Sequence, residues 1–273
     1  MTADTYEVLI ARYGHRDTVR SDVFLNYHLH GQPDGPIGMD YFVWIVRNAE
    51  RTVLVDTGFS RRGGDRRSRQ TLMAVAELYR QLGVRPDDRP AVVVTHAHYD
   101  HIGNLGLFPD SQIIMSHREY DFWTGPYARR TLFHHSVEDD ELAALQQAAA
   151  DGRVRFFSDT ITVAPGIEAV EVGGHTPGQS VVKAVTDDGT VLLAADAVHY
   201  YEELEKDLPF STVADLVGMY AAFDRIRGWA DAGDVAHVVA GHDPGTLQRF
   251  TPVAGRLSGL VSVIGGTHGT AVT

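Results

Sequence analysis

One six-residue segment of the chain, residues 96–101, carries four side chains that can bind metal ions: His96, His98, Asp100 and His101. They follow the apolar run 91–95 (AVVVT), which is typical of a strand buried on both faces. In an extended segment the first two histidines point the same way, because side chains alternate with a period of two residues. A turn after them would direct the aspartate and the last histidine toward a second point. The spacing therefore predicts two adjacent metal ions rather than a polar loop that is rich in histidine by chance.

Three further candidate ligands, His175, Asp196 and His242, lie at the ends of other strand-like runs. Glycines precede both histidines, and glycine lets the backbone bend sharply and approach a metal closely. Taken singly, each histidine could be an ordinary loop residue and the aspartate a turn or cap residue. Their shared position after a predicted strand favours one common site. The chain has no cysteine, so the ligands must be nitrogen and oxygen, which zinc accepts as imidazole and carboxylate.

The elements that must position these residues form two series of strands with helices between them. Predicted strands of the first half cover residues 41–46, 52–55, 91–95 and 112–115, and those of the second half cover 161–163, 167–172, 180–185, 190–194 and 235–240. Helical spacing covers residues 71–82, 138–150 and 213–227, and the glycine-rich tail after Gly265 is expected to be loose. Strands followed by helices in each half predict a layered α/β sandwich rather than a regular βαβ alternation.

Composition and charge narrow the class of partner. The chain has 36 acidic and 24 basic side chains, so its net charge is −12 and it repels nucleic acid and anionic membranes. No apolar run approaches the roughly 20 residues of a membrane-spanning helix. The first residues lack the basic and apolar regions of a signal peptide. We therefore expect a cytoplasmic protein with no nucleic-acid and no membrane partner.

A cluster of arginines stands out against this acidic background. It lies between residues 61 and 69 and consists of Arg61, Arg62, Arg66, Arg67 and Arg69. The commoner explanation for such a cluster is a solvated loop and helix start. The functional alternative is that it steers an anionic substrate or contacts a partner subunit.

The ordered set HxHxDH, then His, Asp and His, resembles the metallo-β-lactamase superfamily, from TVLVDTG at residues 52–58 to Gly241-His242. The resemblance implies a single domain over residues 1–273, with halves of roughly 1–155 and 156–273, folded as a four-layer αβ/βα sandwich. The metal site would lie at the edge between two mixed sheets. Two zinc ions per chain are implied, although other divalent transition metals suit the same ligands. The implied ligands are His96, His98 and His175 for the first ion, Asp100, His101 and His242 for the second, and Asp196 as the bridge. Asp56 is implied to orient a ligand histidine.

Within the superfamily the chain is similar to the N-acyl-homoserine lactonase group. The similarity rests on its length, on Asp196 where several β-lactamases carry cysteine, and on the segment Gly-His-Thr-Pro-Gly around His175. It implies a hydrolase that opens the ester bond of a small lactone by attack of a hydroxide bridging two zinc ions. Asp100 is then the candidate that carries a proton to the leaving oxygen. The substrate is a small lactone or another ester, and a homodimer is suggested by analogy.

One position departs from that group. The lactonases carry a tyrosine three residues after the bridging aspartate, where this chain has His199, followed by Tyr200. Either of these two residues is a candidate donor to the substrate oxyanion. Three other classes stay compatible with the motif. They are a thioesterase of the glyoxalase II kind, a mononuclear iron dioxygenase on the same fold, and a non-catalytic metal-stabilised binding protein.

Overall fold

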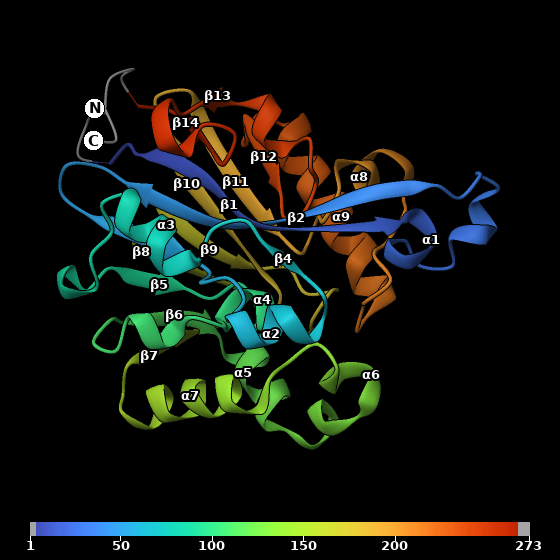
Figure 1. Ribbon diagram of the computed structural model, residues 1–273, viewed down its shortest axis with the longest axis horizontal. Coiled ribbons are helices and arrows are strands. Elements are labelled where there is room, and N and C mark those ends of the chain that lie inside the picture. The colour runs from blue at the N-terminus through green and yellow to red at the C-terminus, as the bar shows by residue number, and fades with distance from the viewer. Residues whose placement is uncertain (1–3, 267–273) are drawn as a thin grey trace.

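The structure is a computed structural model that describes residues 4–266, in which two mixed β-sheets pack face to face (Figure 1). The first sheet has nine strands in the order β13-β14-β1-β2-β3-β5-β6-β7, with β4 paired to β1. Its strands are β1 Glu7–Val19, β2 Pro36–Arg47, β3 Thr52–Val55, β4 Gln70–Thr71, β5 Ala91–Val93, β6 Ile113–Ser116, β7 Val154–Phe157, β13 Thr251–Pro252 and β14 Val261–Ile264. From β3 to β7 the neighbours are parallel, and the pairs on the β1 side are antiparallel.

The second sheet has five strands in the order β12-β11-β10-β9-β8 among the same described residues. They are β8 Thr160–Ala164, β9 Ile167–Glu171, β10 Ser180–Thr186, β11 Gly189–Ala195 and β12 His237–Ala240. Only the pair β11 and β12 is parallel within this sheet. As a result β9, β11 and β12 all run in the same direction, and their carboxyl ends lie at the same edge.

Helices cover the outer faces of the two sheets (Figure 1). The α-helices are α1 Arg20–Val23, α2 Arg61–Arg66, α3 Val75–Gln81, α4 Tyr99–Ile102, α5 His117–Thr124, α6 Thr131–His134, α7 Asp139–Ala150, α8 Tyr201–Lys206 and α9 Leu216–Asp231. Apolar residues of α3 and α7 pack on the first sheet, and apolar residues of α9 pack on the second. No helix within residues 4–266 is both long enough and apolar enough to cross a membrane.

The alternation of side chains along the strands produces the four layers. In β2, Phe42 and Trp44 point into the core between the sheets, whereas Val43 points into the core beneath the helices of the first sheet. In β11, Leu193 lies in the core between the sheets and Leu192 in the core beneath α9. Both strands are apolar on both faces because both faces are buried. The predicted αβ/βα sandwich of two mixed sheets is thus confirmed.

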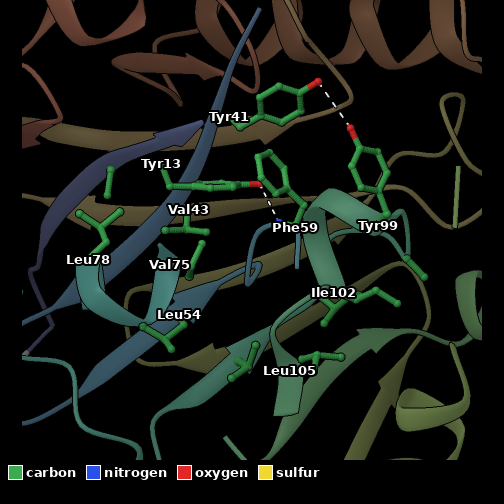
Figure 2. Close-up of a cluster of buried hydrophobic side chains, with 14 of the residues drawn as sticks. Tyr13, Tyr41, Val43, Leu54, Phe59, Val75, Leu78, Tyr99, Ile102 and Leu105 are labelled. Atoms are coloured by element: carbon green, nitrogen blue, oxygen red, sulfur yellow. Dashed lines mark hydrogen bonds between the residues drawn. The ribbon is translucent and has the colours of Figure 1, made fainter. Parts of the chain in front are cut away.

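A buried group of tyrosines fixes the loops that lead into the site. The hydroxyl of Tyr13 accepts a hydrogen bond from the backbone N–H of Phe59 at 2.8 Å, and that of Tyr99 donates to Tyr41 at 3.5 Å (Figure 2). Tyr13 also donates to the carbonyl of Asp100 at 3.2 Å. These bonds tie strands β1 and β2 to the loop after β3 and to α4, and they satisfy hydroxyls that would otherwise be buried without partners.

Several expected elements differ from the structure at their ends. The helix predicted over 71–82 begins only at Val75, because residues 70–71 pair with β1 as β4. The 13-residue strand β1 was not predicted, since Arg12, Gly14 and His15 interrupt its apolar pattern. The two sheets separate between residues 157 and 160, although β13 and β14 return to the first sheet. The single domain with two halves stays a prediction, and residues 267–273 of the predicted loose tail lie outside the described residues.

Candidate metal centre

The seven candidate ligands come together where strands of both sheets end. His96 and His98 follow β5, and His175 follows β9 by a four-residue turn. Asp196 directly follows β11, and His242 lies two residues after the end of β12. In both sheets these are carboxyl ends, so four separate strand-to-loop segments deliver side chains to one edge of the sandwich.

The side chains form two groups, and within each group the potential ligand atoms lie within 4.8 Å of one another. The first group is His96, His98, His175 and Asp196, and the second is Asp100, His101 and His242. The last two residues of the sequence motif reach the second group because α4 begins directly after His98 and turns the chain. This is the turn that the spacing predicts. All seven residues are at most 6 % exposed.

Asp196 lies between the two groups. Its Oδ2 is 3.4 Å from Nε2 of His175 and 3.7 Å from Nε2 of His96. Its Oδ1 is 3.2 Å from Nε2 of His101 and 3.1 Å from Nε2 of His242. One carboxylate oxygen therefore faces each group, as a bridging ligand requires. The carboxylate of Asp100 lies farther from His101 than that of Asp196 does, with Oδ1 3.9 Å from Nε2 of His101.

The inward-facing atoms of the site lack hydrogen-bond partners. Nε2 of His96, His101 and His242 and Oδ1 of Asp196 are inaccessible to solvent and unpaired among residues 4–266. Buried polar atoms without a partner are rare and costly, so their convergence on one point indicates a ligand that satisfies all of them. Imidazole nitrogens and carboxylates with no thiolate are the donors that zinc and related divalent metals prefer. The fold and these two groups together imply divalent metal ions.

The electrostatics of the protein side favour the ligating forms of the first group. Burial, together with the neighbouring imidazoles, lowers the pKa of His96, His98 and His175 well below its usual range. These three rings are therefore neutral at physiological pH, which is the form that binds a metal. Burial raises the pKa of Asp196, but the surrounding histidines outweigh it, so the pKa lies well below its ordinary value and the carboxylate is ionised.

Asp56 orients a ligand, as the sequence resemblance implies. Its Oδ2 lies 2.7 Å from Nδ1 of His101, which leaves Nε2 of that ring to face the site. The same carboxylate accepts hydrogen bonds from the backbone N–H and the hydroxyl of Thr95 at 2.8 and 2.7 Å. Asp56 itself adopts a left-handed backbone conformation with φ of 60°, which turns the chain sharply at the end of β3.

We expect Asp56→Asn to weaken metal binding at the second group by about 10- to 100-fold, because partners that orient a ligand histidine contribute that much to affinity. The affinity of the first group should change less, since the side chain of Asp56 makes no direct contact with its four ligands. Competition titration against a chromophoric chelator measures both affinities. Asp110→Asn changes an exposed aspartate and is the matched control. Equal affinities in all three proteins would contradict the role of Asp56.

The backbone holds His242 beside Asp196. Nδ1 of His242 lies 2.7 Å from the carbonyl oxygen of Asp40, and the His242 N–H donates to the carbonyl of His199 at 2.9 Å. Gly241 packs against the backbone of Ala195, where an added Cβ would lie 2.5 Å from the carbonyl oxygen. A larger residue at position 241 would therefore push the two ligand loops apart.

Glu119 is a supporting residue that sequence reasoning missed. Its side chain is fully buried at the start of α5 and accepts hydrogen bonds from the backbone N–H of Ala97 at 3.0 Å and of Gly178 at 2.9 Å. The indole of Trp123 donates to the same carboxylate at 2.7 Å. Glu119 thus connects the loop that carries His98 with the loop that carries His175. Its only signal in the sequence is an acidic residue in a short helix, which is too common to be informative.

His199 and Tyr200 do not lie on the side of the metal ligands that faces the pocket. Nε2 of His199 is 3.1 Å from Oδ2 of Asp196, its Nδ1 is 3.1 Å from Oε1 of Glu203, and its ring stacks on Phe210. Burial lowers the pKa of His199, but the two carboxylates outweigh it and raise the pKa to about 9. The Tyr200 hydroxyl donates to the carbonyl of Gly38 at 3.1 Å.

Neither residue lines the pocket over the metal centre, so the geometry gives no support to the predicted contact with a substrate oxyanion. His199 supports Asp196 from behind instead. This role was not predicted, although Glu203 is only four residues away in the chain, and the stacking on Phe210 depends on the fold.

A pocket of about 400 Å³ opens over the two groups. His98, Asp100, His175 and Asp196 form part of its lining, so members of both groups face the same space. Its volume is toward the lower end of the roughly 300–1,000 Å³ typical of small-molecule sites. The rest of the lining comes from β1, α1, β2, the segment after α2, the start of α4, the segment after α6 and the loop around Phe210.

A profile of the metallo-β-lactamase superfamily matches residues 38–248, so the chain belongs to this superfamily. An N-acyl homoserine lactonase from a Bacillus species is 27% identical over 190 residues, which cover 63% of this chain and 70% of that protein. A solved quorum-quenching N-acyl homoserine lactone lactonase superposes with a TM-score of 0.74 at 20% identity, over 89% of this chain and 94% of that one. A solved dizinc quorum-quenching lactonase superposes with a TM-score of 0.69 at 20% identity, over 99% and 97% of the two chains.

The predicted superfamily and fold are thereby confirmed, and so is the prediction of a hydrolase at the level of enzyme class. The similarity to lactonases is of low identity. It leaves the substrate of this chain, the number and identity of its metal ions and the roles of individual residues to be argued from the site.

Proposed function

We propose that this protein is a lactonase that uses two zinc ions to hydrolyse the ester bond of a small lactone. The observation that carries the proposal is the pair of adjacent buried ligand groups that share Asp196 and open into one pocket. His96, His98 and His175 would hold the first ion, Asp100, His101 and His242 the second, with Asp196 between them. The names of the relatives, among them a dizinc lactonase, support the same reaction class.

Two zinc ions, when bound, supply Lewis acidity and activate water as a nucleophile near neutral pH. The chain's own residues contribute the geometry. The seven ligands fix where the ester must lie, and their burial excludes bulk water from all sides except the pocket. Asp100 lines the pocket and is the acid–base candidate, with its carboxylate placed to move a proton from water to the leaving oxygen of the opened ring.

The His199, Glu203 and Asp196 side chains form a buried chain of charged groups behind the site. His199 contacts the oxygen of Asp196 that faces the first group. We infer that it is a positioning residue, which holds the bridging carboxylate in one rotamer. This supporting role replaces the contact with substrate that the missing tyrosine suggested.

A pH-indicator assay across matched lactones, thioesters and aryl esters tests the proposed reaction. We expect acid release from lactones by zinc-loaded protein and its loss in His98→Ala, which removes one ligand of the first group. Turnover of thioesters alone would assign the protein to the glyoxalase II kind of thioesterase. No turnover of any ester by protein that holds two metal ions would contradict the proposal. The homodimer and the cytoplasmic location stay predictions.

A further inference from the structure

The pocket over the metal centre carries three arginine side chains, although the whole chain has a net charge of −12. Arg16 comes from β1, and Arg67 and Arg69 come from the segment after α2. The same lining contains Asp22 and the two ligand carboxylates Asp100 and Asp196, so the pocket has both signs of charge. The partners of each arginine decide which of them is available to a ligand.

Arg67 is fully engaged within the protein. Its Nη1 lies 2.7 Å from Oε1 of the buried Glu138, and its Nη2 donates to the carbonyl of His135 at 2.6 Å. Its guanidinium also lies over the ring of Tyr99, 4.0 Å from the centroid. Arg67 is therefore paired with a carboxylate, which Arg62 and Arg66 share, and its donors are used as a part of the pocket wall.

Arg69 has no such counter-charge. Its Nε donates to the hydroxyl of Tyr99 at 3.1 Å and its Nη1 to the carbonyl of Arg67 at 2.6 Å, and both partners are neutral. Within residues 4–266 it makes no salt bridge, and its Nη2 makes no hydrogen bond. Arg69 is half-buried, and a charge that is partly removed from water is normally paired. Asp100 acts on Arg69 only electrostatically, without a salt bridge, so this guanidinium has a free donor and no directly paired carboxylate at the pocket.

Arg16 is only loosely paired. Its Nη2 is 3.6 Å from Oδ2 of Asp22, which is beyond hydrogen-bond distance. The Asp22 side chain is 57% exposed, and the same oxygen accepts a hydrogen bond from the hydroxyl of Thr18 at 3.1 Å. A pair at this distance contributes little, so Arg16 is held only loosely at the pocket, which Asp22 also lines.

Arg69 stands beside the second ligand group. Tyr99, which accepts its Nε hydrogen bond, immediately precedes Asp100, and the Tyr99 and Tyr41 hydroxyls face each other (Figure 2). The ring of Tyr41 packs edge-on against His242, with 5.0 Å between the centroids. One layer of tyrosines therefore separates the free guanidinium from the metal ligands. A small molecule that fills the 400 Å³ pocket reaches both.

We propose that the substrate of this site is a small lactone that carries a carboxylate, and that Arg69 binds this carboxylate. The inference rests on the proposed function, because the metal centre is what places the lactone ring. A guanidinium and a carboxylate form charge-assisted hydrogen bonds, which are about twice as strong as neutral ones. The pocket volume suits one ring with a short charged substituent. This substrate class also gives a function to part of the arginine cluster that the sequence leaves open.

Matched substrates test the proposal: a five-membered lactone with a ring carboxylate and the same lactone with a carboxamide. For the zinc-loaded protein we expect kcat/KM to be at least about tenfold higher for the carboxylate. Arg69→Gln should lower kcat/KM for the carboxylate lactone by about 10- to 100-fold, mainly through KM, as expected for loss of a hydrogen bond to a charged group. The same variant should change kcat/KM for the carboxamide lactone by less than about twofold. Arg69→Lys should recover part of the kcat/KM lost for the carboxylate lactone. Arg61→Gln removes a 92% exposed arginine from the same segment and should leave kcat/KM for both lactones unchanged.

Calorimetry with 3-oxocyclopentane-1-carboxylate and its carboxamide, which contain no ester, gives a second measurement that does not depend on turnover. We expect Arg69→Gln to weaken the binding of the ring carboxylate and not that of its carboxamide. The melting temperature and circular dichroism spectrum of the protein should be unchanged. Equal loss for both substrates or both ring analogues would show that Arg69 acts only through the Tyr99 wall, and would overturn the inference. Hydrolysis of neutral lactones without a preference for the carboxylate would overturn it while leaving the lactonase proposal intact. If no lactone is hydrolysed, the lactonase proposal fails and the calorimetry alone decides on Arg69.

Discussion

Replacing Asp196 with alanine is expected to lower the proposed lactone-hydrolysing activity of the zinc-loaded protein by at least about 1,000-fold. This side chain presents one oxygen to each ligand group, at 3.4 Å from His175 and 3.2 Å from His101. Without it, neither group keeps its shared ligand, and the four surrounding imidazoles lose the negative charge between them. A metal ion acting as a Lewis acid stabilises the transition state by several kcal/mol, and each 1.4 kcal/mol corresponds to a factor of ten in rate.

Steady-state kinetics together with metal analysis by mass spectrometry measures this effect. We expect Asp196→Ala to retain one ion or none, whereas the wild-type protein retains two. The control is Asp187→Ala, which removes an exposed aspartate from the turn between β10 and β11 and should leave rate and stoichiometry unchanged. A variant at position 196 that keeps two ions and a rate within tenfold of the wild type would refute the bridging role.

Removing the metal ions should destabilise the whole fold. The inward-facing nitrogens of His96, His101 and His242 and the Oδ1 atom of Asp196 then stay buried without partners. Ligand binding to the native state stabilises it by about 4 kcal/mol when the free ligand is at 1,000 times its Kd. For a domain of this size, 1 kcal/mol corresponds to roughly 2–4 °C in melting temperature. We therefore expect chelation to lower the melting temperature by about 10 °C.

Differential scanning calorimetry before and after dialysis against a chelator makes this measurement, and adding zinc back should restore the original melting temperature. His98→Ala supplies the matched control, because a protein that lacks one ligand should respond much less to the chelator. A melting temperature that is the same with and without chelator in the wild type would mean that the unpaired atoms are satisfied in another way. The groups would then not be a metal centre.

The sequence by itself identified the chemistry of the site. Four ligands in residues 96–101 and three more after apolar runs are local features, because strand, sharp turn and ligand adjoin one another in the chain. The period of a strand predicted that His96 and His98 point the same way, and the turn expected after His98 is present as the start of α4. Asp56 also lies at a strand end, so its role toward His101 could be inferred from the family pattern and is seen in the 2.7 Å contact.

Contacts between distant segments decided the rest. Glu119 joins two ligand loops that are about 77 residues apart. The strand β1 and the return of β14 to the first sheet depend on pairing across more than 240 residues, which no local pattern reports. Arg69 looked like any other member of a solvated arginine cluster. Only packing shows that Arg67 has a carboxylate partner and Arg69 has none, because the pairing of a charge depends on neighbours that the fold supplies and the adjacent sequence does not.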